Sequence, residues 1–564
     1  MVSMKHLFLK IFFLVLLFGG ADIFFATGAS LEYATFISTD SATNSFVMKY
    51  GGLEEKKYYD CSLSSLACTA TSSRESALSA SPGNIFDSIK NTEERVIFKW
   101  FSLDRRFVYY YQFADEEHPY RFYNLIDTKT KKSYYYKSPV PFLDLMTEQN
   151  RLFSISPDSK TLYYLDDRDG SPAIYYVDLT HLSKSAMKGK RVTKTTYSVA
   201  DFIAYDENNV YFIANRVNPL TWSLYHYNIE TSGIEKIADN VSYADPIKKI
   251  GERIVFLRMR GNSVVPSVYN PASKTFSDFL LPFASAKEEL FGAKVARYGS
   301  LWGSLSLPDI STAPKGKALP LVVWLHGGPY RQSSLTLHSF SSYGVYDWVL
   351  NEARKNGTAI LKLDYNGSYG YGTDFIESLK GGVGVKDVKE VLSALRIAKK
   401  ELEKEHPVSH VYLVGNSYGG YLALRTIAED PEAITGAFSI NGVTDWSALL
   451  TNLEDSLFNA YFDGPPGKEN KKMYDNADIL GRYDDIDSKN KITLVQSTDD
   501  MTIDPLQATL LKSRWQPFGI NVTVIPIQGE DHVFHKTASI STLCNSLFAF
   551  ISIGTGAGEK CAFQ

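Results

Sequence analysis

The sequence predicts an all-β propeller domain followed by an α/β domain with a mainly parallel sheet. In the first half, turns rich in Asp, Asn, Ser and Gly alternate with short strands rich in Tyr and Val. In the second half, apolar strands without alternation are separated by helical stretches, as in a parallel sheet covered on both faces. A chain of 564 residues is long enough for each domain to have its own core.

The propeller prediction rests on turn-and-strand units that begin at Ser102, Ser156, Tyr205 and Gly251. These starts lie roughly 45 to 55 residues apart, which is close to the blade period of a four-stranded propeller. We assign residues 30–284 to this domain with five to seven blades, and five or six blades of ~40 to 45 residues fit the length best. A β-sandwich with similar turns is the alternative, since strand spacing does not separate the two.

The second domain is assigned to residues 285–556, with 557–564 as a C-terminal tail. Its expected strands are 321–325, 359–363, 411–414, 492–495 and 522–525. Between the second and third strands, residues 385–399 repeat apolar side chains at the helical period. Strands therefore alternate with helices over this part of the chain.

A nucleophile elbow stands at the end of the strand 411–414. The strand leads into Gly415-Asn416-Ser417-Tyr418-Gly419, and a helical stretch over 421–428 follows. Strand, G-x-S-x-G turn and helix together are typical of the α/β-hydrolase fold, in which glycines let neighbouring elements approach the sharp turn. We therefore expect an α/β-hydrolase domain with Ser417 as its nucleophile.

A serine hydroxyl needs a base, and in this fold an acid and then a histidine follow it in the chain. His532 and His535 are the two histidines after Ser417. We choose His532, because it lies in a loop just after the last expected strand, and expect His535 to be a surface or capping residue. The loop after strand 492–495 offers three carboxylates as the acid: Asp499, Asp500 and Asp504.

The oxyanion hole is expected to use two main-chain amides. One belongs to Tyr418, directly after the nucleophile, and the other to Gly328 in the loop that follows strand 321–325. An ordinary strand-to-loop turn is the alternative for this second loop. His326 precedes Ser417 in the chain, and we interpret it as a residue that braces the loop.

Several motifs together resemble the prolyl oligopeptidase family, and most closely its dipeptidyl-peptidase IV and acylaminoacyl-peptidase branches. The motifs are His326-Gly327-Gly328-Pro329, residues 364–372, residues 415–421, the Asp500 loop and Glu530-Asp531-His532. The segment 303–308 resembles the strand that opens that family's catalytic domain. The resemblance implies a propeller ahead of the hydrolase domain, an active site enclosed between them, and Asp500 as the acid.

The resemblance also places a substrate pocket at Trp446, Leu449 and Leu453, whose spacing favours one face of a helix. A stripe that faces the core is the alternative. Relatives of dipeptidyl-peptidase IV usually carry tyrosines at the two leucine positions, so a preference for proline does not follow. A dipeptidyl activity would also need paired glutamates in the propeller, for which Glu116-Glu117 is a candidate beside the simpler interpretation as a charged loop tip.

Two further positions depart from the family pattern. Asn366 stands where the family usually has Arg, and Gln496-Ser497 stands where it usually has His-Gly. Neither change removes a catalytic group.

The first 29 residues predict a secretory signal peptide, and hence a periplasmic or secreted protein. Lys5 and Lys10 precede an apolar run over 11–18, and small residues end at Ala29. An uncleaved membrane anchor is the alternative, although Lys10 and Asp22 weaken it. Cys61 with Cys68, and Cys544 with Cys561, lie close in sequence and fit two local disulfides, with free buried thiols as the alternative.

These features predict a serine peptidase that acts on short peptides, with an esterase or an inactive propeller-based binding protein as alternatives. The formal net charge of -4 gives no basic surface for nucleic acid or anionic membranes. No Cys/His spacing indicates a metal, and no cofactor is expected. The expected partners are peptide substrates, and the sequence does not determine an oligomeric state.

Overall fold

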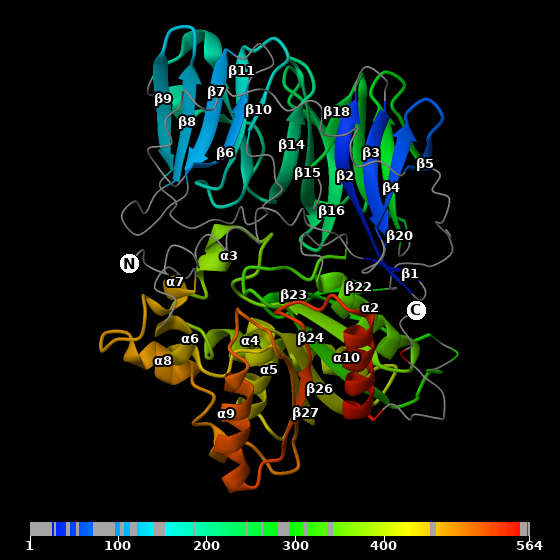
Figure 1. Ribbon diagram of the computed structural model, residues 1–564, viewed down its shortest axis with the longest axis vertical. Helices are drawn as coiled ribbons and strands as arrows, with labels where there is room; N and C mark the ends of the chain where they lie inside the picture. Colours follow the sequence, from blue (N-terminus) through cyan, green and yellow to red (C-terminus); the bar gives the residue numbers. More distant parts are fainter. Residues whose placement is uncertain are drawn as a thin grey trace.

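The computed structural model describes most of the chain from Phe25 onward (Figure 1). The described residues are 25–27, 30–40, 45–51, 56–71, 96–101, 106–112, 121–138, 153–183, 186–243, 246–260, 263–279, 293–309, 311, 313–335, 342–451, 458–552 and 561.

The N-terminal domain contains five separate sheets among the described residues, and in each sheet the strands follow one another in chain order. The first sheet contains β1 (Phe25–Thr27), β2 (Ser30–Asp40), β3 (Ser45–Gly51), β4 (Lys56–Ser62) and β5 (Ala67–Thr71). The second and third contain β6 (Val96–Phe101), β7 (Phe107–Gln112), β8 (Arg121–Asp127) and β9 (Lys132–Ser138), and β10 (Phe153–Ile155), β11 (Thr161–Asp166), β12 (Ala173–Asp178) and β13 (Lys190–Arg191). The fourth and fifth contain β14 (Val199–Ala204), β15 (Asn209–Asn218), β16 (Thr221–Asn228) and β17 (Gly233–Ala238), and β18 (Lys248–Ile250), β19 (Arg253–Arg260), β20 (Ser263–Asn270) and β21 (Thr275–Asp278).

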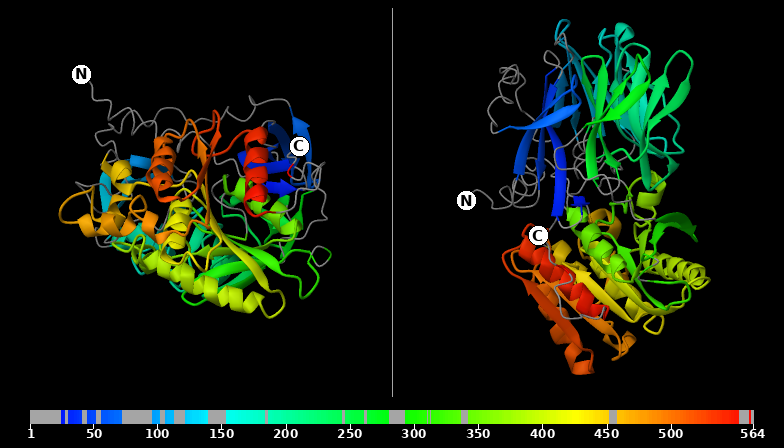
Figure 2. Two further views of the ribbon diagram at one scale, coloured as in Figure 1. Left: turned by 90° about the horizontal axis from the view of Figure 1, so that it is seen from below. Right: turned by 90° about the vertical axis from the view of Figure 1, so that its right-hand side faces the viewer.

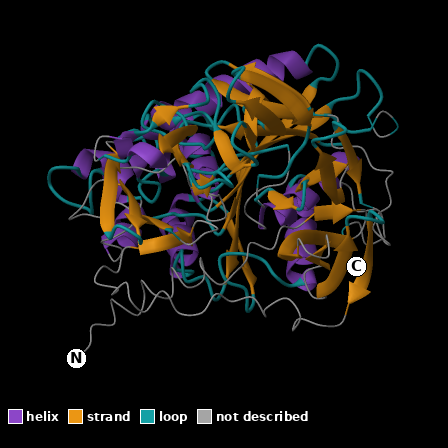
Figure 3. Cartoon of the chain, turned by 90° about the horizontal axis from the view of Figure 1, so that it is seen from above, coloured by secondary structure: helices purple, strands orange, loops and turns teal. Residues whose placement is uncertain are grey.

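This arrangement is of the propeller type. A sandwich would gather its strands into two packed sheets, whereas here each run of four or five consecutive strands forms its own antiparallel sheet. In the view from above, strands lie in several separate groups (Figure 3). The predicted propeller class is confirmed.

The polar turns that predicted the blades are held by their own side chains. Asp158 Oδ1 accepts hydrogen bonds from Ser156 Oγ at 2.6 Å and from the Lys160 amide at 3.1 Å. In the corresponding turn of the next sheet, Asp206 Oδ1 accepts the Asn208 amide at 2.9 Å. Such side-chain bonds stabilise a tight turn and so fix where each strand begins.

The C-terminal domain contains one sheet of eight strands in the order β22-β23-β25-β24-β26-β27-β28-β29. Its strands are β22 (Lys294–Tyr298), β23 (Leu301–Ser306), β24 (Leu319–Leu325), β25 (Ala359–Asp364), β26 (Val408–Asn416), β27 (Gly436–Ile440), β28 (Lys491–Ser497) and β29 (Val522–Ile527). From β25 to β29 all neighbouring strands are parallel, whereas β23 is antiparallel to both β22 and β25. The predicted α/β-hydrolase layout is confirmed. The sheet begins at β22, so the segment 303–308 is not its opening strand, and β23 ends at Ser306.

Helices cover both faces of this sheet, because alternate residues of its strands point to opposite sides (Figures 1 and 2). In β24, Leu321 and Val323 belong to the core cluster that includes α4 and α5, whereas Val322 and Trp324 belong to the cluster with α2 and α10. The helices of the domain are α2 (Ser342–Lys355), α3 (Thr373–Glu377), α4 (Lys386–Leu402), α5 (Tyr418–Glu429), α6 (Trp446–Thr451), α7 (Asn459–Phe462), α8 (Lys471–Ala477), α9 (Leu506–Trp515) and α10 (Thr537–Phe550).

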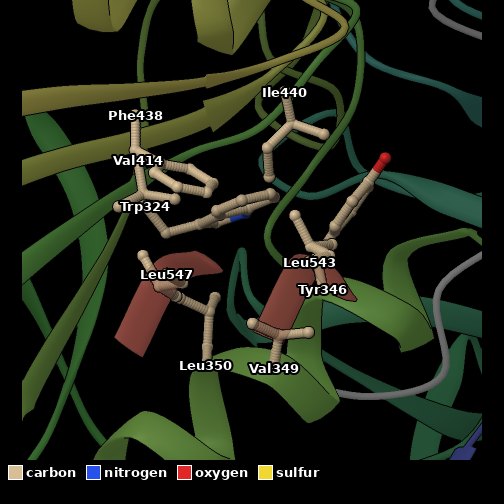
Figure 4. Close-up of a pocket in the computed structure, with 9 residues that line it drawn as sticks. All are labelled: Trp324, Tyr346, Val349, Leu350, Val414, Phe438, Ile440, Leu543 and Leu547. Carbon is tan, nitrogen blue, oxygen red and sulfur yellow. The ribbon is translucent and has the colours of Figure 1, made fainter. Parts of the chain in front are cut away.

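A small void of about 10 Å³ lies in the core between the sheet and the helices α2 and α10 (Figure 4). Its lining is mainly apolar and comprises Trp324, Tyr346, Val349, Leu350, Val414, Phe438, Ile440, Leu543 and Leu547. A space of this size holds at most one water molecule. It is a packing defect of the core and offers no room for a substrate.

The N-terminal domain contacts the edge of the sheet at which the parallel strands end. Trp222 Nε1 donates a hydrogen bond to Gln332 Oε1 at 3.1 Å, in the chain after β24. Asn215 Nδ2 donates to the Gly370 carbonyl at 2.7 Å, after β25. The ring of Trp222 also stacks on Tyr369, with centroids 5.8 Å apart. The propeller therefore lies over the edge where an α/β sheet binds its ligands.

Some sequence predictions fall on residues outside the described part of the chain. These are residues 1–24 and 28–29 of the expected signal peptide, Glu116-Glu117, Leu453 of the expected pocket, and the expected tail 557–564 apart from Cys561. Phe25–Thr27, within the expected signal segment, pairs with β2 as β1. None of the helices in the described ranges combines the length and apolarity that crossing a lipid bilayer requires.

The two local disulfides expected from the cysteine spacing are both formed. Cys61 pairs with Cys68 on neighbouring strands β4 and β5, and Cys544 of α10 pairs with Cys561. The described part of the chain has no free cysteine. The second disulfide attaches Cys561 to the helix that covers one face of the hydrolase sheet.

We predict that a Cys544→Ser/Cys561→Ser variant loses stability in the C-terminal domain. The disulfide closes a loop with a sequence separation of 17 residues, and closing a loop of this length is worth about 3 kcal/mol. The thermal midpoint of the hydrolase domain should fall by roughly 6–12 °C in differential scanning calorimetry. The Cys61→Ser/Cys68→Ser variant is the control and should leave this midpoint in place, while an unchanged midpoint in the first variant would contradict the prediction.

Candidate active site

Ser417 occupies the sharp turn between β26 and α5. Its φ of 55° and ψ of -118° put a non-glycine residue in a strained backbone conformation. A side chain on Gly415 would overlap the carbonyl of Gly419, and one on Gly419 would overlap the carbonyl of Leu325. These two glycines let the first turn of α5 lie directly against β24 and β26, and so hold Ser417 at the tip of the elbow.

The expected base and the expected acid lie on two neighbouring loops and form a hydrogen bond with each other. His532 Nδ1 lies 2.8 Å from Asp500 Oδ2. The other oxygen, Asp500 Oδ1, accepts the amides of Thr502 and Ile503 at 2.9 Å each. Asp500 is only 4% exposed and is held by two amides, which is the setting that a residue expected to orient the His532 ring would need.

The other candidates for the acid and the base lie outside this hydrogen bond. Asp499 and Asp504 are exposed, and Asp504 Oδ1 accepts the amide of Leu506 at the start of α9. His535 is exposed and pairs with Asp531 at 3.4 Å. Among the described residues, only Asp500 of the three candidate acids is bonded to His532.

Asn441, directly after β27, connects the nucleophile side of the site to the histidine loop. The Ser417 amide donates to the carbonyl of Ile440 at 2.8 Å. The next residue, Asn441, has a φ of 46°, and its Nδ2 donates to the His532 carbonyl at 3.2 Å and to Ser497 Oγ at 3.0 Å. Ile440 and Asn441 thus connect the two loops, because the carbonyl of Ile440 is bonded to Ser417 and the side chain of Asn441 is bonded to the His532 loop.

Glu530 fixes the other end of the histidine loop. Its carboxylate is 2% exposed and accepts the amides of His535 and Lys536 at 3.0 and 2.8 Å, where α10 begins. Its carbonyl accepts the amide of Asp499 from the acid loop at 3.0 Å. The loops that carry Asp500 and His532 are therefore bonded to each other by main chain as well as by the hydrogen bond between these two side chains.

No hydrogen bond joins Ser417 Oγ to His532 within the described part of the chain. Catalytic hydrogen bonds are often long in a protein without substrate and tighten only when substrate binds. The bond from His532 Nδ1 to Asp500 leaves Nε2 as the nitrogen that can take the serine proton.

The backbone of the loop after β24 comes close to the nucleophile. A Cβ built on Gly327 would lie 3.1 Å from Ser417 Cβ. The Gly327 amide is already used, because it donates to Tyr343 Oη at 2.8 Å. Gly328, with a φ of 118°, follows it, and the assignment of the oxyanion hole to the amides of Gly328 and Tyr418 stays a prediction.

His326 is fully buried and braces this loop. Its Nε2 lies 2.8 Å from Ser368 Oγ and 3.6 Å from Asp364 Oδ1. Burial lowers the pKa of His326 to about 4 and raises that of Asp364 to about 7. A ring buried in this way is unsuited to exchange protons with a substrate, in agreement with the expected bracing function.

Trp446 and Leu449, expected in the substrate pocket, lie in the core beside Tyr418. They are 3% and 8% exposed, and α6, which carries them, ends at Thr451. Trp446 sits in an aromatic cluster with ring centroids 5.3 to 5.7 Å away in Tyr418, Tyr421, Phe458 and Phe462. The cluster adjoins the residue after the nucleophile, and the pocket assignment itself stays a prediction.

The positions that depart from the family pattern have their own partners. Asn366 Nδ2 donates to Glu390 Oε1 at 2.7 Å, and burial raises the pKa of Glu390 to about 7. Gln496 Nε2 lies 3.4 Å from Asp500 Oδ2. Gln496 thus contacts Asp500 without replacing it.

The described residues contain no group of His, Cys, Asp and Glu side chains that could hold a metal ion.

The fold and the arranged Ser417 elbow, His532 and Asp500 define a serine hydrolase of the α/β-hydrolase class. Residues 344–556 match the prolyl oligopeptidase family, and residues 91–245 match the dipeptidyl peptidase IV (DPP IV) N-terminal region. The C-terminal domain is therefore a serine peptidase domain of the prolyl oligopeptidase type, and a propeller-type domain precedes it.

Curated relatives match over part of their length. The acylamino-acid-releasing enzyme of Homo sapiens is 37% identical over 157 residues, which cover 27% of this chain and 20% of that enzyme. Dipeptidyl aminopeptidase BIII of Pseudoxanthomonas mexicana is 28% identical over 244 residues, which cover 41% of this chain and 33% of the relative. The aligned segments therefore span a fifth to a third of these relatives.

Solved structures match over nearly the whole chain. A puromycin-hydrolyzing peptidase of Mycobacterium tuberculosis has a TM-score of 0.69 at 14% identity and covers 95% of both chains. The acylaminoacyl peptidase of Pyrococcus horikoshii has a TM-score of 0.57 at 13% identity and covers 96% of this chain and 98% of that one. At this identity the likeness shows a shared fold.

Sequence reasoning missed the residues that connect the loops, above all Asn441 and Asp387. Asp387 is buried at the start of α4 and accepts a hydrogen bond from Tyr418 Oη at 2.6 Å. A signal existed for Asn441, because Asn441-Gly442 directly follows an apolar strand and Asn tolerates positive φ. Asp387 had no such signal, since an acidic residue in the first turn of a helix is ordinary.

We predict that Asp500→Asn lowers kcat by about 10⁴-fold with little change in fold, because the amide no longer holds His532 in the required tautomer. Steady-state kinetics on a peptide or ester substrate, with circular dichroism as the fold check, measures this. Asp499→Asn and Asp504→Asn are matched controls and should stay within about threefold of wild type. A loss of the same size in either control would move the acid away from Asp500.

Proposed function

We propose that the protein is a secreted serine peptidase that hydrolyses short peptides through Ser417, His532 and Asp500. The observation that carries the proposal is the 2.8 Å bond from His532 Nδ1 to Asp500. The main-chain carbonyl of Ile440 is bonded to the Ser417 amide, and the side chain of the next residue, Asn441, is bonded to the His532 loop. A histidine with a structural function alone would not require a strained serine at the same edge of the sheet.

In the proposed reaction, Ser417 Oγ attacks the carbonyl carbon of the scissile bond and gives its proton to His532 Nε2. The negative charge that develops on the carbonyl oxygen is held by the amides of Gly328 and Tyr418, aided by the N-terminus of α5. His532 then protonates the leaving amine, and an acyl-enzyme on Ser417 remains. Water attacks the acyl carbon, His532 takes its proton and returns it to Ser417, and the acid product leaves.

Access to the site supports a preference for short peptides. The propeller-type domain contacts the chain after β24 and β25, at the sheet edge that carries Ser417, through Trp222, Asn215 and their partners. A folded protein would have to pass this domain to reach the serine. Acylaminoacyl and dipeptidyl peptidase activities are the two cleavage modes of the relatives, and we propose that this chain uses one of them.

We also propose that Trp446, Leu449 and Leu453 shape an apolar pocket for the residue before the scissile bond. The Trp446 ring lies 5.7 Å from that of Tyr418, centroid to centroid, directly beside the nucleophile. An apolar wall at this position favours an apolar or aromatic side chain of the substrate.

A periplasmic or extracellular location follows from the same proposal. It is supported by the signal-like pattern of the first 29 residues and by two disulfides, which persist in oxidising compartments. The assignment of residues 30–284 and 285–556 to two domains belongs to the proposal as well.

We predict that Ser417→Ala folds normally and loses about 10⁵- to 10⁶-fold in kcat, because the covalent intermediate cannot form. Peptide libraries with free and with blocked amino ends, each read by mass spectrometry, measure the activity and the cleavage mode together. Turnover of blocked peptides alone indicates acylaminoacyl release, and turnover of free peptides two residues at a time indicates dipeptidyl release.

An ester series run beside the peptides decides between peptidase and esterase. The proposal expects kcat/KM on the best peptide to be comparable to that on a matched ester. Hydrolysis of esters with no peptide turnover would replace the peptidase by an esterase, and no turnover of either, identical in wild type and Ser417→Ala, would favour a binding protein.

A further inference from the structure

The two amides assigned to the oxyanion hole come from separate loops that three stacked rings connect. The rings of His326 and Tyr365 lie 4.6 Å apart at an angle of 17°, and those of Tyr365 and Tyr418 lie 5.7 Å apart at 16°. All three residues are at most 1% exposed. His326 begins the loop that carries Gly328, and Tyr418 is the residue after the nucleophile, so the column joins both arms of the hole.

Hydrogen bonds attach the first end of this column to the loop after β24. Tyr365 Oη donates to the carbonyl of His326 at 2.5 Å, and His326 Nε2 lies 2.8 Å from Ser368 Oγ. Ser368 Oγ in turn donates to the carbonyl of Tyr365 at 2.5 Å. The position of Tyr365 therefore determines the position of the loop after β24.

The other end of the column is held by a buried carboxyl. Tyr418 Oη donates to Asp387 Oδ2 at 2.6 Å, and Asp387 Oδ1 accepts the amide of Val388 at 2.9 Å. Asp387 has no solvent exposure, and burial raises its pKa to about 6. Burying a carboxyl group costs free energy. Among the described residues, Asp387 is bonded to neither Ser417 nor His532.

We propose that Asp387 is a positioning residue of the oxyanion hole, which holds Tyr418 by its hydroxyl and thereby fixes the amide that receives the oxyanion. This inference rests on the proposed function. A hole works when its donors lie 2.7–3.1 Å from the oxyanion, and a displacement of about 1 Å costs about 10²-fold in rate. Tyr418 carries both the amide and the ring that stacks on Tyr365, so its hydroxyl is the point at which α4 can set the position of both amides.

A double-mutant cycle with Asp387→Asn, Tyr418→Phe and the combined variant tests the inference. Each single change is expected to lower kcat by about 10- to 100-fold with KM within about threefold of wild type, because the oxyanion forms only in the transition state. The combined variant is expected to be no slower than the slower single one, since both changes break the same bond. The affinity for a peptide boronate, which forms the tetrahedral adduct, should fall by the same factor as kcat/KM.

The propeller-type domain supplies a matched control for these variants. Tyr205 Oη donates to Glu252 Oε2 at 2.7 Å, which is the same kind of tyrosine–carboxyl pair away from the hydrolase sheet. Tyr205→Phe should leave kcat, KM and boronate affinity within about twofold of wild type. If Asp387→Asn fails to fold, Tyr418→Phe alone must show the loss in kcat and in boronate affinity.

Two results would overturn the inference while the proposed function stands. One is an active wild type in which both single variants keep their kcat and boronate affinity, and the other is a cycle in which the two losses multiply. A wild type without turnover and without boronate binding would instead overturn the proposed function and this inference with it.

Discussion

The close approach of α5 to β24 and β26 is the constraint on which the site depends. It exists because Gly415 and Gly419 carry no side chain, and any Cβ at either position would overlap main-chain atoms of the neighbouring elements. The approach forces Ser417 into its left-handed conformation, and the surrounding core overcomes that local strain. The same approach sets Tyr418 beside Tyr365 and Trp446, so the proposed nucleophile, one amide of the proposed oxyanion hole and the proposed pocket share one origin.

The remaining parts of the site follow from the parallel sheet. Six neighbouring strands, from β25 to β29 in the sheet order, end at the same edge, and the loops after them carry Gly328, Ser417, Asn441, Asp500 and His532. Parallel strands oblige these loops to lie side by side even though more than 200 residues of sequence separate the first from the last. Hydrogen bonds between the loops, such as those of Asn441 and Glu530, then hold these neighbouring loops in a defined arrangement.

Residues with a local sequence signature could be predicted, and residues with purely tertiary partners could not. Ser417 stands in a strand–turn–helix pattern, and His532 is one of two histidines after it. The apolar strands of the sheet are recognisable from their length and their lack of alternation. The choice of Asp500 over Asp499 and Asp504 needed the family resemblance, because only the fold reveals which carboxylate faces the imidazole. Asp387 and Asn441 were missed, since their partners lie 31 and 91 residues away in the chain. The Asn-Gly pair after β27 marks a turn at Asn441 but not the contact with His532.

Covalent labelling identifies the nucleophile. Wild-type protein is treated with a fluorophosphonate probe, digested, and the modified peptide is sequenced by mass spectrometry. The account predicts one adduct, on Ser417, formed at a rate that falls sharply in His532→Ala and Asp500→Asn. An adduct on another residue, or peptide hydrolysis that continues with Ser417 unmodified, would contradict it.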